Sequence, residues 1–264
     1  MKSNTVLLII ITVALLAGAF LVLKPPSKTS PPVVAVVEEA PRTATPMDEY
    51  TRFFAKKRFE IDDGKQKRGL TYYWFEPQGK PYPAGLKFPL VVVLHGAPGK
   101  AYAAKYLITQ KMQLDYPAFI AVPQSPAGKK WAMPQKFTGQ EFGAEQAAKY
   151  VYHPEVESLP DVAELVSRLS KEYPVDMSRV YIAGCSDGGT GVYGAALRYP
   201  QIFAGGVAIS GAWSFADASK MNQMPLLVMH GSQDAIFPVQ IARGISGIIK
   251  KSGGNILNSE IPTE

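Results

Sequence analysis

The sequence predicts an α/β protein, with a mostly parallel β-sheet and helices on both of its faces. Short runs of β-branched and other apolar residues recur along the chain, and amphipathic segments separate the later runs. Continuous apolar runs are typical of strands buried on both faces, and their alternation with helices is typical of a parallel sheet. These two observations define the expected fold class.

The composition is that of a folded protein. Of the 264 residues, 47% are hydrophobic and 19% are charged, which excludes a chain disordered throughout. The net charge of +6 is small, and basic residues occur in short groups such as Lys129-Lys130. We therefore expect no nucleic-acid partner. The single cysteine, Cys185, excludes an intramolecular disulfide and a cysteine-based metal site.

The N-terminal part is expected to lie outside the folded domain. Residues 1–23 contain a mostly apolar run, from Val6 to Leu23, near the length that a membrane-spanning helix needs. They predict a signal-anchor, with a cleaved signal peptide or a buried core helix as alternatives. Residues 24–47 are rich in proline and predict a semi-rigid linker. We assign residues 48–264 to the folded domain.

This arrangement predicts where the protein resides. An uncleaved anchor would hold the domain at a membrane, on the side away from the cytoplasm. Cleavage of the segment would instead give a secreted or periplasmic protein.

The strands follow in order along the domain. Two short strand-like runs flank the turn Asp62-Asp63-Gly64, which predicts a hairpin formed by residues 58–61 and 70–75. Runs rich in valine, isoleucine and leucine predict buried strands at residues 89–94, 118–122, 179–183, 206–209 and 226–229.

Helices are predicted between the later strands. Residues 161–173 carry apolar side chains at helical spacing on one face. Residues 189–199 are rich in small side chains, and residues 240–250 carry a stripe of isoleucines. A final strand is expected at residues 255–261.

Residues 184–188, Gly-Cys-Ser-Asp-Gly, match the pattern G-x-S-x-G between a predicted strand and a predicted helix. In this setting the pattern predicts a nucleophile elbow, a tight turn that strains the serine backbone and exposes its hydroxyl. The N-terminus of the helix that follows favours developing negative charge. Ser186 is the candidate nucleophile, and the alternative is a structural glycine-rich turn.

The segment His95-Gly96-Ala97-Pro98-Gly99 follows the strand at residues 89–94 and predicts an oxyanion loop. Acyl transfer develops a negatively charged oxygen that two N–H donors stabilise. We assign these donors to the backbone N–H groups of Ala97 and of Asp187, the residue after the nucleophile. The alternative is an ordinary turn.

The segment His230-Gly231-Ser232-Gln233-Asp234 follows the strand at residues 226–229. A carboxylate at this place orients a general-base histidine and stabilises its charged form. Asp234 is therefore the candidate acid, with a strand-terminal turn residue as the alternative.

Together these motifs resemble those of the α/β-hydrolase superfamily, over about residues 58–264. Residues 89–96, 174–184 and 230–234 are similar to the branch of carboxylesterases that includes polyhydroxybutyrate depolymerases and feruloyl esterases. The resemblance implies an α/β-hydrolase fold and a serine hydrolase that cleaves carboxylic esters through an acyl-serine intermediate. It implies no metal and no organic cofactor, and a small-molecule or polymeric ester as substrate.

The sequence departs from this superfamily in its general base. Superfamily members carry the catalytic histidine on a loop after the last strand, but residues 235–264 contain no histidine. His95 and His230 end strands at the edge where Ser186 lies, and His153 lies in an insertion, so each is a remaining candidate. We expect the C-terminal catalytic-histidine loop to be missing from this chain, as in a truncated form of a longer protein.

Two other functions stay open. A chain without its base is compatible with a catalytically inactive binding protein of the α/β-hydrolase fold. A peptidase of similar fold would use the same nucleophile and acid.

The segment at residues 123–159 is the largest insertion, and its aromatic side chains suit a shallow pocket for an acyl or aryl ester. The alternative is that these side chains pack within the protein, and the same two interpretations apply to Trp213. The short segment at residues 210–225 leaves no room for a lid domain. The aromatic residues of the insertion are Trp131, Phe137, Phe142, Tyr150 and Tyr152.

Overall fold

The computed structural model describes residues 52–62, 67–96, 103–134, 136–137 and 157–262. The predicted anchor, the predicted linker and Ala97 lie outside these ranges. None of the described helices combines the length and apolarity that a membrane crossing requires.

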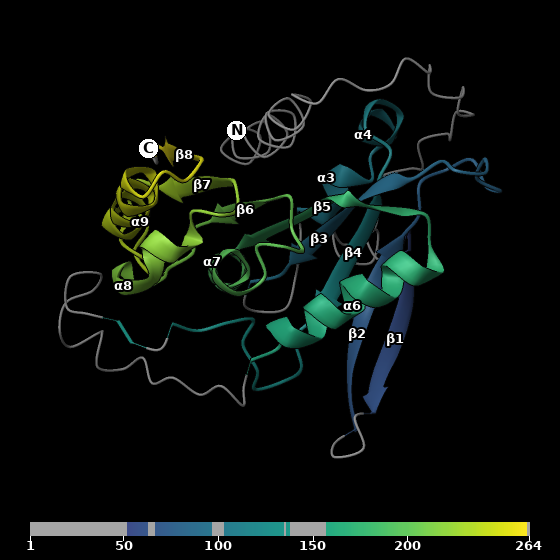
Figure 1. The fold of residues 1–264 in the computed structure, drawn as a ribbon, viewed down its shortest axis with the longest axis horizontal. Helices are drawn as coiled ribbons and strands as arrows, with labels where there is room; N and C mark the ends of the chain where they lie inside the picture. Colours follow the sequence, from purple (N-terminus) through teal and green to yellow (C-terminus); the bar gives the residue numbers. More distant parts are fainter. Residues whose placement is uncertain (1–51, 63–66, 97–102, 135, 138–156, 263–264) are drawn as a thin grey trace, which may run out of the picture.

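Within the described residues, eight strands form one sheet in the order β1-β2-β4-β3-β5-β6-β7-β8 (Figure 1). β1 and β2 form an antiparallel hairpin, β2 is antiparallel to β4, and every other neighbouring pair is parallel. The predicted hairpin, buried strands and final strand are thus confirmed. The strands are β1 (Ala55–Asp62), β2 (Lys67–Phe75), β3 (Phe88–Leu94), β4 (Phe119–Gln124), β5 (Val175–Cys185), β6 (Gly205–Ile209), β7 (Leu226–Gly231) and β8 (Ile256–Ile261).

β5 differs most from its predicted range, because it is longer at both ends. At its start Val175 pairs with Phe88 of β3, across a shift in register. At its end Gly184 and Cys185 still pair with Ala208 and Ile209 of β6. The strand therefore continues to the residue before Ser186.

The three predicted helices are confirmed as α6 (Leu159–Glu172), α7 (Asp187–Arg198) and α9 (Val239–Lys251). α7 begins two residues earlier than predicted, directly after Ser186. Short helices that lack enough residues for a periodic pattern were not predicted. They are α3 (Ala104–Leu107), α4 (Gln110–Asp115), α8 (Phe215–Ala218) and the 3-10 helix η2 (Ser219–Met221).

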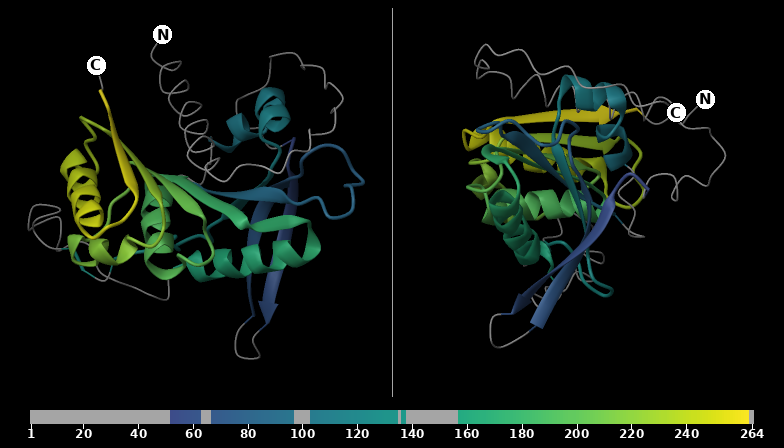
Figure 2. Two further views of the ribbon diagram at one scale, coloured as in Figure 1. Left: turned by 45° about the horizontal axis from the view of Figure 1, so that its top comes forward. Right: turned by 90° about the vertical axis from the view of Figure 1, so that its right-hand side faces the viewer.

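The helices cover both faces of the sheet, as predicted. Figure 2 shows α3 and α4 on one side and α6 and α7 on the other. Val92 belongs to the apolar cluster beneath α6, α7 and α9, whereas its neighbour Val93 belongs to the cluster beneath α3. Successive side chains of a strand point to opposite faces, so burial on both faces explains the unbroken apolar runs.

The parallel arrangement positions the site. The C-terminal ends of parallel strands lie at one edge of a sheet, where ligands of open α/β sheets bind. The segments that follow β3, β5 and β7 carry the three predicted motifs, so the fold places them at the same edge.

Candidate active site

Ser186 lies between the last residue of β5 and the first residue of α7, with φ 57° and ψ −118°. Ser186 and Ser210 are the non-glycine residues with positive φ among those described. Such a conformation costs about 1–3 kcal/mol and persists only where the surrounding structure imposes it. The observed geometry is that of the strained turn expected from the sequence.

Backbone contacts explain why this turn needs glycine on both sides of the serine. A Cβ atom on Gly184 would lie 2.3 Å from the carbonyl carbon of Gly188, and one on Gly188 would lie 2.3 Å from the carbonyl oxygen of Leu94. A side chain at either position would therefore force β3, β5 and α7 apart.

Two hydrogen bonds hold the backbone of Ser186 at the N-terminus of α7. The Ser186 N–H donates to the Ile209 carbonyl at 2.8 Å, and the Thr190 N–H donates to the Ser186 carbonyl at 3.0 Å. The N–H groups of the first helical turn have no acceptor within the helix, and the helix dipole adds positive charge there. The Asp187 N–H thus belongs to an end of a helix that suits a negatively charged oxygen.

The segment after β3 approaches this turn closely. A Cβ atom on Gly96 would lie 2.9 Å from the Cys185 carbonyl oxygen and 3.2 Å from the Ser186 Cβ atom. Ala97, the other predicted donor, is the next residue and lies outside the described ranges, so its role stays a prediction.

Asp234 follows β7 in a turn that its own side chain stabilises. Its Oδ1 atom accepts hydrogen bonds from the N–H groups of Ile236 and Phe237, both at 2.9 Å. Desolvation raises the pKa of the Cys185 thiol, and the charge of Asp234 raises it further. The predicted acid therefore lies within electrostatic range of the residue that precedes Ser186.

Both ring nitrogens of His95 already have hydrogen-bond partners. Nε2 accepts from the Ser125 N–H at 3.0 Å, and Nδ1 donates to the Gly96 carbonyl at 2.9 Å. The indole N–H of Trp131 donates to the His95 carbonyl at 2.7 Å. Because Nε2 accepts a hydrogen bond, the ring is in its neutral form, and burial lowers the pKa of His95. This network gives His95 a structural role in the segment after β3.

His230 is likewise held inside the fold. Its side chain is fully buried, and Nε2 donates to the Phe237 carbonyl at 2.7 Å. The same nitrogen lies 3.4 Å from Oδ2 of Asp234. A ring without solvent exposure has no path to a substrate, so neither described histidine suits the role of base. His153, the third histidine, lies outside the described residues.

Trp213 and the aromatic residues of the insertion that the structure describes are part of the core. Trp131 and Trp213 have 0% exposure and Phe137 has 4%, and all three belong to the main apolar cluster. For these residues the packing interpretation is correct. Phe142, Tyr150 and Tyr152 lie outside the described ranges.

Sequence reasoning missed two features near the elbow. Ser210, after β6, has φ 46° and donates its N–H to the Met229 carbonyl at 2.8 Å. Lys130 lies near Asp187, with 3.5 Å between its Nζ atom and Oδ1 of the carboxylate. Neither residue belongs to a sequence motif, and only the folded chain brings each of them to the turn.

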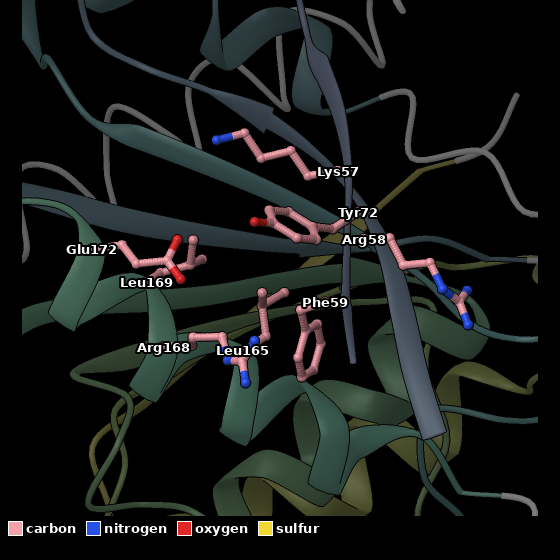
Figure 3. Close-up of a pocket in the computed structure, with 8 residues that line it drawn as sticks. All are labelled: Lys57, Arg58, Phe59, Tyr72, Leu165, Arg168, Leu169 and Glu172. Carbon is pink, nitrogen blue, oxygen red and sulfur yellow. The ribbon is translucent and has the colours of Figure 1, made fainter. Parts of the chain in front are cut away.

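A pocket of about 300 Å³ lies between the β1-β2 hairpin and α6, and none of its lining residues belongs to the elbow (Figure 3). Its three cationic side chains already have partners: Lys57 lies over the Tyr173 ring, Arg168 lies over the Phe59 ring, and Arg58 pairs with Glu60. Among the described residues, no group of three histidine, cysteine, aspartate or glutamate side chains is placed to share a metal ion. The pocket is lined by Lys57, Arg58, Phe59, Tyr72, Leu165, Arg168, Leu169 and Glu172.

The strand order and the strained serine between β5 and α7 define an α/β-hydrolase fold. A family model described as phospholipase/carboxylesterase matches residues 83–262, which is more than half of the chain. The protein belongs to the phospholipase/carboxylesterase family.

A solved esterase structure agrees with this assignment, and a peptidase structure shares the fold. A thermostable esterase is 25% identical, with a TM-score of 0.66, over 81% of this chain and 56% of that one. The Pyrococcus horikoshii acylaminoacyl peptidase has a TM-score of 0.57 at 15% identity, over 86% of this chain and 40% of that one, which shows a shared fold alone.

One curated relative is also an esterase in part. A bifunctional acetylxylan esterase/xylanase of Neocallimastix patriciarum is 29% identical over 83 residues. That match covers 31% of this chain and 12% of the relative. The chain therefore corresponds to a small part of that protein, and to about half of the esterase structure.

The strain at Ser186 predicts an unusual order of stability. Glycine adopts this conformation without penalty and alanine does not, so we expect Ser186→Gly to unfold with a free energy about 1 kcal/mol higher than that of Ser186→Ala. Ser246, inside α9, provides the matched control, where glycine should be the less stable of the two by about 0.5–1 kcal/mol. Urea titrations of the four variants measure both differences. The same order at both positions would contradict the assigned strain.

Proposed function

We propose that the protein is a serine esterase that cleaves carboxylic esters through an acyl-serine intermediate on Ser186. The observation that carries this proposal is the strained Ser186 at the junction of β5 and α7. Membership of the phospholipase/carboxylesterase family supports the ester as the bond cleaved.

In the proposed reaction the Ser186 hydroxyl attacks the ester carbonyl and gives up its proton to a general base. The carbonyl oxygen becomes negatively charged and accepts hydrogen bonds from the N–H groups of Asp187 and Ala97. Collapse of this intermediate expels the alcohol, and water then hydrolyses the acyl-serine. Asp234 would hold the imidazole of the base in the orientation that accepts the proton.

A peptidase and an inactive binding protein are the alternatives. The likeness to acylaminoacyl peptidases extends to the fold alone, so the peptidase has less support than the esterase. The narrower resemblance to polyhydroxybutyrate depolymerases and feruloyl esterases stays a prediction.

A fluorophosphonate probe tests the nucleophile in the longest encoded form of the protein. We expect labelling of one serine, and Ser186→Ala should abolish labelling and lower ester turnover by roughly 10⁴- to 10⁶-fold. Ser210→Ala is the matched control, because Ser210 also has positive φ and follows the neighbouring strand. Equal labelling of both variants would overturn the proposal. Faster cleavage of amides than of matched esters would favour the peptidase.

We propose further that the general base comes from outside the described residues. The hydrogen bonds of His95 and the complete burial of His230 support this proposal. His153 is one source, and a histidine carried by residues beyond 264 in a longer form of the protein is the other.

Ester turnover of the 264-residue chain, of its His153→Ala variant and of the longest encoded form separates these sources. We expect the longest form to be at least about 10³-fold faster than the 264-residue chain, because a serine nucleophile without its base loses most of its turnover. Full turnover of the 264-residue chain that is abolished by His153→Ala would identify His153 instead. Full turnover in all three would require a different base. No labelling of Ser186 and no ester turnover in any of the three would favour the binding protein.

We propose that residues 1–23 anchor the domain to a membrane, outside the cytoplasm, or are removed as a signal peptide. The apolar run followed by the proline-rich residues 24–47 supports this. The full-length protein should stay in the membrane pellet after an alkaline carbonate wash, and a form without residues 1–47 should not. A soluble protein of lower mass would indicate cleavage of the signal peptide. A protein of full mass that is soluble before any carbonate wash would contradict both the anchor and the cleaved signal peptide.

A further inference from the structure

A carboxylate stands beside the proposed oxyanion site. Asp187 follows Ser186, and its N–H is a proposed donor to the negatively charged oxygen of the intermediate. Its side chain is only 26% exposed, so water screens its charge poorly. Burial raises the pKa of Asp187, and the charge of Lys130 lowers it. An ionised Asp187 would oppose the charge that the reaction develops, unless a cation offsets it.

Lys130 supplies that cation. Its Nζ atom lies 3.5 Å from Oδ1 of Asp187, and its side chain is 50% exposed. His95 is the other titratable group near Asp187, and its ring is neutral because its Nε2 atom accepts a hydrogen bond and carries no proton. The balance of charge around Asp187 therefore depends on Lys130.

The backbone of Lys130 is anchored to elements that flank the elbow. The Lys130 carbonyl accepts from the Ser158 N–H at 2.8 Å, and the Trp131 carbonyl accepts from the Leu159 N–H at 2.9 Å, at the start of α6. The Trp131 indole N–H donates to the carbonyl of His95 at 2.7 Å. The lysine is thus attached to α6 on one side and to the segment after β3 on the other.

We propose that Lys130 is a positioning residue for ester hydrolysis, which offsets the Asp187 carboxylate beside the oxyanion site. This inference rests on the proposed esterase function. Lys130 acts through Asp187 and does not contact the reacting atoms. A competing explanation is that the pair only holds the segment at residues 125–134 in place.

A double-mutant cycle in the longest encoded form of the protein separates the two explanations. We expect Lys130→Met to lower kcat by about three- to tenfold with little change in KM, and Lys130→Arg to restore most of the loss, because the charge is what matters. If Lys130 offsets the carboxylate, Asp187→Asn should restore most of the kcat that Lys130→Met loses, because no charge is left to offset. If the pair only holds the segment, the double variant should be as slow as Lys130→Met. Lys129→Met is the matched control for loss of a neighbouring lysine.

The pH dependence tests whether the effect of Lys130 depends on the charge of Asp187. At low pH Asp187 is protonated in both proteins, so the kcat of Lys130→Met divided by that of the unmodified protein should approach 1. The ratio should fall as pH rises through the pKa of Asp187. Carbon-13 NMR of the Asp187 carboxyl should show a higher pKa in Lys130→Met than in the unmodified protein.

The outcomes distinguish failure of this inference from failure of the proposed function. A double variant as slow as Lys130→Met, a ratio independent of pH, or an unchanged Asp187 pKa would overturn the inference while Ser186-dependent hydrolysis stands. A protein without Ser186-dependent hydrolysis would overturn both.

Discussion

Backbone packs directly against backbone where β3, β5 and α7 meet, and this contact holds the candidate active site together. The missing side chains of Gly184 and Gly188 let the start of α7 approach the carbonyl of Leu94. That approach leaves Ser186 no room for an ordinary conformation, so it takes a positive φ at the end of the central strand. The helix N-terminus and the serine thus come to the same place for one steric reason.

The polar groups around this turn show how burial decides the role of a side chain. His95 and His230 lie at the catalytic edge, but both ring nitrogens of His95 and the Nε2 atom of His230 form hydrogen bonds within the fold, and the His230 side chain is fully buried. Those partners fit them to hold loops and not to exchange protons with a substrate. Asp187 is also partly buried, and Lys130 lies beside it. Around Ser186 the structure thus describes the Lys130–Asp187 ion pair and, within electrostatic range of Cys185, the Asp234 carboxylate.

The family of the protein is established, whereas its substrate is a proposal. The match to the phospholipase/carboxylesterase family covers most of the sheet and the elbow. Pocket lining and core packing were both open interpretations for Trp131 and Trp213, and both side chains fill the core beside α7. The pocket between the hairpin and α6 involves none of the motif residues. The ester bond thus has stronger support than any particular acyl or alcohol group.

The sequence by itself determined the α/β class, the sheet strands, the three long helices and the elbow, because each has a local pattern. Strands buried on both faces need unbroken apolar runs, long helices need a periodic stripe, and a crowded turn needs glycine at fixed positions. Only the tertiary structure decided the extent of β5, the short helices, the engagement of the two histidines and the pairing of Lys130 with Asp187. Each of these depends on contacts between segments distant in the sequence, which no local pattern encodes.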